Sequence, residues 1–273
     1  MEVYYFQIKD VNHFCGIFKQ IFNFGKMTTQ NFSQNGNITL IDVGTHSCQE
    51  IKSFTDSKFL LFKLIKRIIK NIYKKRSLNI THFISLIINH FKLKNVCKKI
   101  TLILIEPNYL HFEEKPYKFS SMVLPAAIKS NNNKNRSRTL KLFIANNDPK
   151  SVGNSIFNSK GNVNKNNFIN VLSLNSYELL EILEKTYLHK NSKVILRINC
   201  EGMEDEIIYE FKNYLANRLK GIMGSLKDVK FVKGDKKYSQ LMKFIDDEGI
   251  IYIPFYPDID TWSEAHSFLY SLI

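Results

Sequence analysis

Short apolar runs rich in β-branched residues alternate along the chain with segments whose apolar residues repeat at helical spacing. Strands are expected at residues 37–44, 99–108, 122–128, 139–146, 193–202, 221–226 and 249–256. Helices are expected at residues 176–188, 203–219 and 237–249. Strands that alternate with helices form βαβ units around a mostly parallel sheet. The chain is therefore expected to adopt an α/β fold with helices on both faces of the sheet. Sheets of this kind bind their ligands at the carboxyl ends of the strands.

The expected sheet begins only at residue 37, and an aromatic-rich segment precedes it. We predict an N-terminal helical preface at residues 1–36, with its helix around residues 13–22, followed by one domain at residues 37–273. Two asparagine-rich tracts, residues 131–138 and 158–167, are predicted to be loops because of their polar, turn-favouring composition.

A cationic amphipathic helix is expected at residues 58–76, inside an insertion at about residues 53–98. Apolar residues expected on one helical face are Leu61, Phe62, Ile65, Ile68, Ile69 and Ile72. Basic residues that fall largely on the other face are Lys63, Lys66, Arg67, Lys70 and Lys74. Such a helix either covers the core with its apolar face or contacts an anionic membrane surface.

The formal net charge of the 273-residue chain is +14, which favours anionic partners such as phosphorylated small molecules, nucleic acid or an anionic membrane. The four cysteines have no paired spacing, which argues against a structural zinc site and for reduced thiols in a cytosolic protein. The N-terminal residues lack the pattern of a signal peptide, and no apolar run reaches about 18 residues. We expect a cytoplasmic protein, with contact to the inner face of the membrane through residues 58–76 as a further option.

The stretch from Asn37 to Ile51 places Gly44 directly after an apolar run that ends in Ile-Asp-Val. Because glycine has no Cβ, Gly44 suits either an ordinary strand-to-helix turn or a close approach of the backbone to a ligand. The three glycines of a dinucleotide-binding loop are missing. A ligand without a pyrophosphate requires less glycine, and S-adenosylmethionine is such a ligand.

Glu106 lies at the carboxyl end of the next expected strand. A carboxylate there can accept hydrogen bonds from both hydroxyls of a ribose, as in nucleotide-binding βαβ units. The separation between Gly44 and Glu106 is far longer than the roughly 20 residues of such units, and the insertion at about residues 53–98 accounts for the excess. The alternative is a solvated glutamate at a strand end.

A third polar cluster follows the strand at residues 193–202. Asn199 and Glu201 are expected to face the crevice at the carboxyl edge of the sheet, where Glu201 can orient or deprotonate an acceptor hydroxyl. Glu204 and Asp205 are interpreted instead as stabilising the N-terminus of the following helix, and the same explanation stays open for Glu201.

These motifs, in this order, resemble the FkbM family of S-adenosylmethionine-dependent methyltransferases. The family pattern reads roughly Ile-Asp-Val-Gly-Ala-x-x-Gly-Glu, Glu-Pro-Asn and Lys-Ile-Asp-x-Glu-Gly-x-Glu, and the chain has IDVGTHSCQE, IEPN and RINCEGME. LPAAI and VGNSIF resemble two further family segments, so the resemblance covers roughly residues 37–215. It implies a Rossmann-like class I methyltransferase fold and O-methylation, often of sugar hydroxyls in polysaccharides or natural products.

The resemblance also implies roles for individual residues. Contacts to S-adenosylmethionine are implied for Asp42, Gly44, Thr45, His46 and Ser47 (methionine part), for Glu106 and Asn108 (ribose), and for Pro125 and Ala126 (adenine). Catalytic positions beside the transferred methyl group are implied for Asn199 and Glu201.

The chain departs from the family pattern at Cys48 in place of a glycine, at Arg197 in place of a lysine and at Asn199 in place of an aspartate. The change at Asn199 removes a charge where a base or a metal ligand is otherwise found, and no metal is expected. His46 lies in the predicted cofactor loop and titrates near neutrality, so His46 and Glu201 are the candidate general bases. The alternative for His46 is a loop histidine that hydrogen-bonds to the backbone.

We therefore expect an O-methyltransferase that uses S-adenosylmethionine and acts on a sugar or glycan precursor, of an anionic kind in view of the positive charge. A nucleic-acid methyltransferase or binder is the second interpretation. Only the charge supports it, because the aromatic-basic interleaving of RNA-binding sheets is not evident. The third interpretation is a non-catalytic scaffold that kept the methyltransferase fold.

Overall fold

The computed structural model describes residues 37–74, 80–96, 99–113, 116–117, 120–131, 138–151, 153–256 and 259–272. The expected N-terminal helical preface and most of the asparagine-rich tract at residues 131–138 lie outside these ranges.

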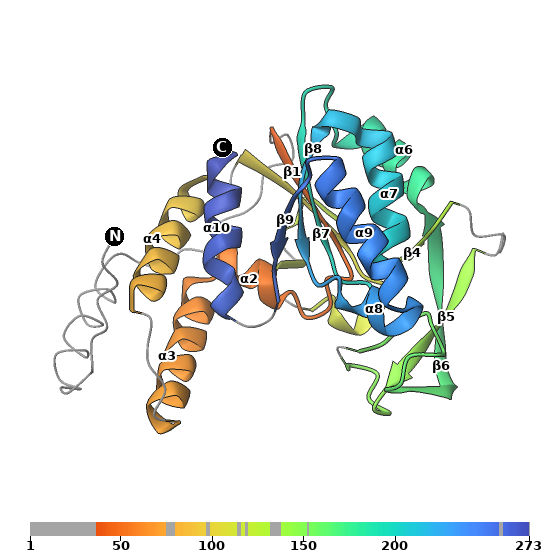
Figure 1. Cartoon of the computed structure of the whole chain (residues 1–273), viewed down its shortest axis with the longest axis horizontal. Coiled ribbons are helices and arrows are strands. Elements are labelled where there is room, and N and C mark those ends of the chain that lie inside the picture. The colour runs from red at the N-terminus through yellow and green to blue at the C-terminus, as the bar shows by residue number, and fades with distance from the viewer. Residues whose placement is uncertain are drawn as a thin grey trace.

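Within these ranges a sheet of six parallel strands forms the centre of the molecule (Figure 1). Its members are β1 (Ile38–Val43), β2 (Ile100–Ile105), β3 (Met122–Leu124), β7 (Lys193–Ile198), β8 (Leu219–Gly224) and β9 (Ile251–Pro254), in the order β3-β2-β1-β7-β8-β9. Every residue of β1 and β2 is buried, which explains why their sequences, ITLIDV and ITLILI, are mostly apolar and do not alternate between apolar and polar residues. The α/β expectation is confirmed, and the order of the strands is Rossmann-like, with its reversal between β1 and β7.

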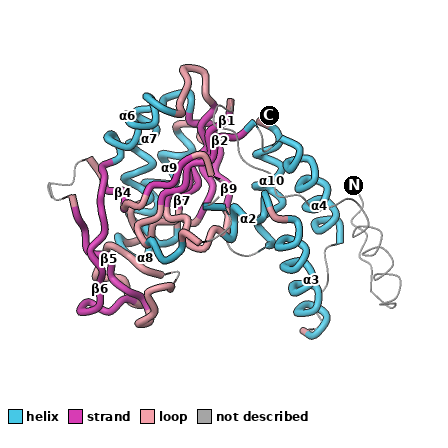
Figure 2. The backbone as a smooth tube through the Cα atoms, turned by 180° about the vertical axis from the view of Figure 1, so that it is seen from behind, coloured by secondary structure: helices cyan, strands magenta, loops and turns pink. Residues whose placement is uncertain are grey.

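Helices cover both faces of this sheet (Figures 1 and 2). One layer contains α2 (Gln49–Thr55), α3 (Ser57–Tyr73), α4 (Ile80–Val96) and α10 (Trp262–Ser271). The other contains α6 (Ser176–Thr186), α7 (Glu204–Leu215), α8 (Lys227–Lys233) and α9 (Asp235–Asp247). Short 3₁₀ turns are η2 (Tyr109–His111), η3 (Ala216–Arg218) and η4 (Ile259–Thr261). Alternate residues of β1 serve the two cores, because Leu40 points into the first layer and Ile41 into the second.

Buried histidines connect the inserted helices to the rest of their layer. The carbonyl oxygen of Ser53 in α2 lies 2.9 Å from Nδ1 of His90 in α4 and 3.0 Å from Nε2 of His266 in α10. The Ser57 hydroxyl, at the start of α3, lies 2.7 Å from Nε2 of His90. These bonds join all four helices of the layer, so α3 and α4 are held against the domain and do not form a separate unit.

A second, smaller sheet lies beside the first and corrects two sequence-based predictions. It contains β4 (Ala127–Lys129), β6 (Val163–Asn175) and β5 (Thr139–Ala145), in the order β4-β6-β5. The strand expected at residues 122–128 is interrupted at Pro125, so β3 and β4 belong to different sheets. The loop expected at residues 158–167 is wrong from Val163 onward, because antiparallel pairing with β5 holds this asparagine-rich stretch extended.

The structure divides the apolar face that was expected for the helix at residues 58–76. The side chains that pack inward are Leu60, Leu61, Leu64 and Ile68. Phe62 and Ile69, expected on that same face, are 63% and 61% exposed. Apolar residues occupy most of the circumference of this helix, so their spacing alone does not fix which sector packs; contacts with α2 and η4 decide it.

Across the described ranges, no helix combines the length and the apolar character needed to cross a lipid bilayer.

Candidate functional site

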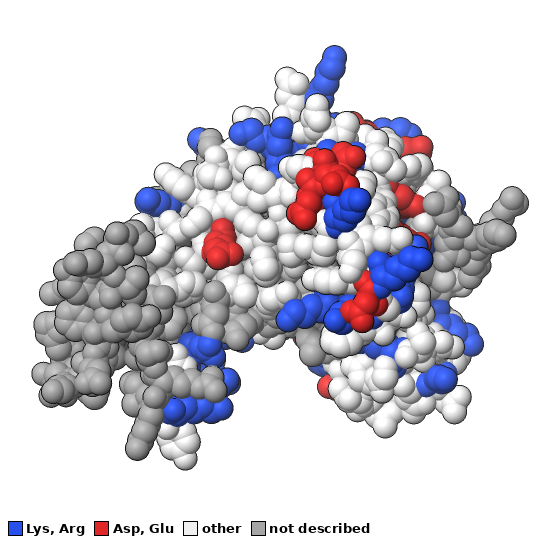
Figure 3. Space-filling view, in the orientation of Figure 1, with Lys and Arg blue, Asp and Glu red and all other residues white. Residues whose placement is uncertain are grey.

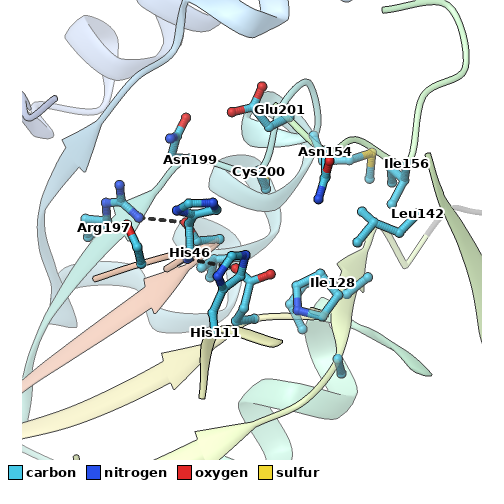
Figure 4. A pocket seen from close by; sticks show the side chains of 18 of the residues that line it. His46, His111, Ile128, Leu142, Asn154, Ile156, Arg197, Asn199, Cys200 and Glu201 are labelled. Atoms are coloured by element: carbon cyan, nitrogen blue, oxygen red, sulfur yellow. Dashed lines mark hydrogen bonds between the residues drawn. The ribbon is translucent and has the colours of Figure 1, made fainter. Parts of the chain in front are cut away.

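A cavity lies at the carboxyl ends of β1, β2 and β7, beside the reversal of strand order. It contains about 800 Å³ of unfilled space, part of which is open to solvent. Figure 4 shows two unlike walls: Arg197, Asn199 and His46 on one side, and Ile128, Leu142 and Ile156 on the other. A cavity with one apolar wall and a few convergent polar groups is the usual form of a small-molecule site.

Gly44 is required by the protein's own packing at the first strand end. Its φ of +75° lies in the left-handed region, and a Cβ added there would meet the carbonyl oxygen of Asn199 at 2.0 Å. The Gly44 N–H donates to the carbonyl of Ile105 at 2.9 Å. The glycine therefore lets the ends of β1, β2 and β7 come together, and in doing so it forms part of the cavity wall.

Strained backbone is concentrated in the loops of this site. His46, Cys48 and Glu201 adopt φ values of 49°, 54° and 61°, which non-glycine residues rarely adopt. Each such conformation costs of order 1–3 kcal/mol and persists only when surrounding contacts impose it. Here the hydroxyl of Tyr117 donates to the His46 carbonyl at 3.0 Å, and the hydroxyl of Ser155 donates to the Glu201 carbonyl at 3.0 Å.

Glu106 stands at the end of β2 with both carboxylate oxygens turned toward backbone donors. The N–H of His46 donates to Oε2 at 2.8 Å, and the N–H of Asn108 donates to Oε1 at 2.9 Å. Burial raises the pKa of Glu106 to about 7, although both hydrogen bonds act in the opposite direction. Each carboxylate oxygen keeps a lone pair beyond the bond it already accepts, so the group can still bind two hydroxyls.

Arg197 lies on the polar side of the cavity and is hydrogen-bonded to two buried carboxylates. Its Nη1 donates to Oδ1 of Asp42 and to the carbonyl of Gly44, both at 2.8 Å, and its Nη2 donates to Oε1 of Glu50 at 2.5 Å. Burial raises the pKa of Asp42 to about 6, and Arg197 opposes that rise. Among the described residues, Nε of Arg197 and Oδ2 of Asp42 are buried without a hydrogen-bond partner.

The loop after β7 is organised by Glu204, which is not part of the cavity wall. Its two carboxylate oxygens accept from the N–H groups of Cys200 at 2.8 Å and Gly202 at 2.9 Å. Burial raises the pKa of Glu204 to about 7. The neighbouring Glu201 is among the residues that line the cavity, but its carboxylate pairs with Lys160, whose ammonium also lies 3.1 Å from Asp228.

His46 projects into the cavity from the loop after β1. Its Nε2 lies 3.0 Å from the carbonyl oxygen of Lys150, an acceptor, so Nε2 carries the hydrogen and Nδ1 keeps its lone pair. Its ring lies 4.0 Å from that of His111, centroid to centroid. Burial lowers the pKa of His46, which keeps the ring neutral and able to accept a proton at pH 7.

The structure places the residues expected at the site in two groups. Those that line the cavity are Gly44, His46, Ser47, Glu106, Ala126, Asn199 and Glu201. Those that lie behind or beside its wall are Asp42, Thr45, Asn108 and Pro125. Thr45 donates its hydroxyl to the Asp42 carbonyl at 3.0 Å, and the Asn108 amide donates to the Pro149 carbonyl at 2.6 Å. Pro125 is exposed between β3 and β4. The individual roles of both groups stay predictions.

Several lining residues were not expected from the sequence. The segment between β5 and β6 contributes Ser151, Asn154 and Ile156, and η2 contributes His111. Asn154 and Ile156 belong to the VGNSIF stretch, which did carry a signal through its family resemblance. The only sequence signal at Arg197 is its departure from the family pattern. No group of three or more His, Cys, Asp or Glu side chains suited to a metal ion occurs in the described part of the chain.

Comparisons with protein-family models, with curated proteins and with solved structures gave no match for this chain.

Proposed function

We propose that the protein is an S-adenosylmethionine-dependent methyltransferase that transfers a methyl group to a hydroxyl of a sugar or glycan precursor. One observation carries the proposal. Three short motifs that are far apart in the sequence, ending in Gly44, Glu106 and Asn199, meet around a single cavity at the carboxyl edge of a Rossmann-like sheet. Ligands of such sheets bind at this position.

The residues of the cavity are suited to each part of the cofactor. Glu106 keeps acceptor capacity for the two ribose hydroxyls. The apolar wall around Ala126 and Ile128 suits the adenine ring, and the polar loop at Gly44 and Ser47 suits the amino-acid part. The cluster of Arg197 with two carboxylates has a net negative charge. This charge complements S-adenosylmethionine, whose sulfonium, ammonium and carboxylate together give a net positive charge.

When bound, the cofactor supplies an activated methyl group on its sulfonium. The chain itself has to align an acceptor hydroxyl and remove its proton. Alignment in a preformed cavity can lower the barrier by several kcal/mol, at most about 7–11. His46 Nδ1 is the candidate proton acceptor, because the contact to Lys150 fixes the opposite ring nitrogen as a donor. Glu201 is the weaker candidate, since Lys160 already neutralises its carboxylate.

Isothermal titration calorimetry with S-adenosylmethionine is the first test of this proposal. We expect one site per chain, followed by product formation with a panel of sugar nucleotides. Absence of binding would overturn the proposal. Binding with no transfer to sugar nucleotides, glycans or RNA would favour the non-catalytic scaffold, the alternative supported by the pairing of Glu201 with Lys160.

His46→Asn should separate the proton acceptor from the cofactor site. Asparagine tolerates the φ of 49° at this position, so the loop is retained, and the backbone N–H that binds Glu106 is unchanged. We expect methyl transfer to slow by roughly 10²–10⁴-fold while the Kd for S-adenosylmethionine changes little. His111→Asn, at the neighbouring ring, is the matched control. Equal losses of rate in both variants, or a parallel loss of affinity in His46→Asn, would contradict this role.

A further inference from the structure

The solvent-facing side of α3 carries large apolar side chains that the domain does not bury. Phe62 and Ile69 are 63% and 61% exposed, and Tyr73 at the end of the helix is 89% exposed. Their spacing of seven and four positions places them on one helical face. This face is distinct from the buried one formed by Leu60, Leu61, Leu64 and Ile68. The helix therefore has a second apolar stripe.

Exposed lysines alternate with these apolar residues. Lys66 lies beside them on the same face, Lys70 lies at its edge, and Lys74 follows directly after the helix. The sequence of α3 contains no Asp or Glu. We call this set the α3 stripe; it consists of Phe62, Lys66, Ile69, Lys70, Tyr73 and Lys74. Apolar side chains flanked by lysines, on a helix without acidic residues, complement a surface that offers both anionic groups and an apolar interior.

The α3 stripe lies on the functional side of the molecule. The C-terminal half of α3 projects beyond the body on the same side as the carboxyl ends of the central strands, as both views show (Figures 1 and 2). The antiparallel pair of β5 and β6 projects to that side as well, across a hollow from α3 (Figure 3). This pair exposes Lys141, Phe168 and Leu172. A surface bound at α3 would thus lie on the side to which the strand ends point.

We propose that the α3 stripe binds the surface of an anionic phospholipid bilayer. Phe62, Ile69 and Tyr73 enter the interfacial region, and the three lysines contact the lipid phosphates. Lipid fits better than nucleic acid because Ile69 and Phe62 gain from an apolar interior that a polyanion in water lacks. The proposal does not depend on the methyltransferase assignment.

The test is sedimentation of the full-length protein with two kinds of vesicle, one of pure phosphatidylcholine and one of phosphatidylcholine mixed with about a third of anionic phosphatidylglycerol. We expect the protein to pellet with the anionic vesicles and to be released by high salt. Each lysine near an anionic surface contributes roughly a factor of five, so Lys66→Gln/Lys70→Gln/Lys74→Gln should weaken partitioning by on the order of 100-fold. Phe62→Ser/Ile69→Ser/Tyr73→Ser should also reduce it at least tenfold.

The matched control makes the same change of charge elsewhere. Lys236→Gln/Lys237→Gln/Lys243→Gln alters three exposed lysines of α9, in the helical layer on the opposite face of the sheet, and should bind vesicles like the parent. An equal loss in this control would show that net charge alone drives binding, and would overturn the proposal. It would also be overturned by equal binding to pure phosphatidylcholine, or by RNA binding that depends on the α3 stripe without pelleting of vesicles. A lowered melting temperature of Phe62→Ser/Ile69→Ser/Tyr73→Ser would show that another segment, such as residues 1–36, covers the α3 stripe. That result would also overturn the proposal.

Discussion

Arg197→Met is expected to lower the free energy of unfolding by about 3–5 kcal/mol, the largest effect of any single substitution considered for this chain. Arg197 is 1% exposed and lies between Asp42 and Glu50, which are themselves 1% and 4% exposed. Methionine fills a similar volume but leaves two buried carboxylates without a cation, and a broken buried ion pair typically costs that amount. The loss would be measured by guanidinium titration with linear extrapolation.

Two comparison variants make the Arg197 prediction specific. Arg218→Met removes an arginine that pairs with Glu184, where both side chains are about a quarter exposed, so we expect a loss below about 1 kcal/mol. The triple variant Arg197→Met/Asp42→Asn/Glu50→Gln removes all three charges and should recover most of the stability, because no buried charge is then unpaired. A loss for Arg197→Met no greater than that for Arg218→Met would refute the argument.

The central sheet could be predicted from the sequence because its strands are buried on both faces. A strand such as β1 or β2 has a mostly apolar sequence without alternation, and several of the segments between the strands have apolar residues at helical spacing. Beyond the central sheet this signal fails for clear reasons. β6 begins in an asparagine-rich stretch whose extended form depends on pairing with β5. The apolar residues of α3 surround too much of the helix to identify its buried side.

The position of the candidate site could be predicted, but its internal bonding could not. Gly44, Glu106 and Asn199 each follow an apolar run, so the sequence indicates that they share one edge of a parallel sheet. The bond between Arg197 and Asp42 joins residues 155 positions apart, and no local pattern indicates it. The same is true of Lys160 and Glu201, which meet only because the segment between β5 and β6 folds back over the strand ends.

Glu106→Gln is expected to raise the Kd for S-adenosylmethionine about 30- to 100-fold. Glutamine retains the size of the side chain and one acceptor oxygen, but it loses the charge that strengthens hydrogen bonds to the ribose hydroxyls. Hydrogen bonds to charged groups contribute about 1.5–3 kcal/mol, and the expected loss corresponds to about 2–2.7 kcal/mol. Calorimetry would measure it directly. Stability should fall as well, because the amide nitrogen of glutamine faces one of the two backbone N–H groups that donate to the carboxylate.

Glu204→Gln is the matched control for this substitution. Glu204 is also a buried carboxylate that accepts two backbone N–H bonds, and burial raises its pKa to about 7 as well. It organises the loop after β7 without lining the cavity. If the effect of Glu106→Gln comes from contact with the ribose, Glu204→Gln should leave the Kd within about threefold of the parent value. Similar losses in both variants would instead assign Glu106 a role in loop structure alone.

The pH dependence of adenosine binding provides a second readout of the same carboxylate. Adenosine lacks the sulfonium, ammonium and carboxylate of the full cofactor, so near neutrality only groups of the protein titrate. Because burial raises the pKa of Glu106 to about 7, the ionised form that accepts from both hydroxyls predominates only above that pH. Affinity should therefore be constant above about pH 8 and should fall up to about tenfold for each unit below pH 7. In Glu106→Gln, adenosine should bind weakly and with an affinity that does not change over this pH range. If the pH dependence of the affinity persists in this variant, another group is responsible for it. Asp42 is then the first candidate, because its pKa is raised to about 6.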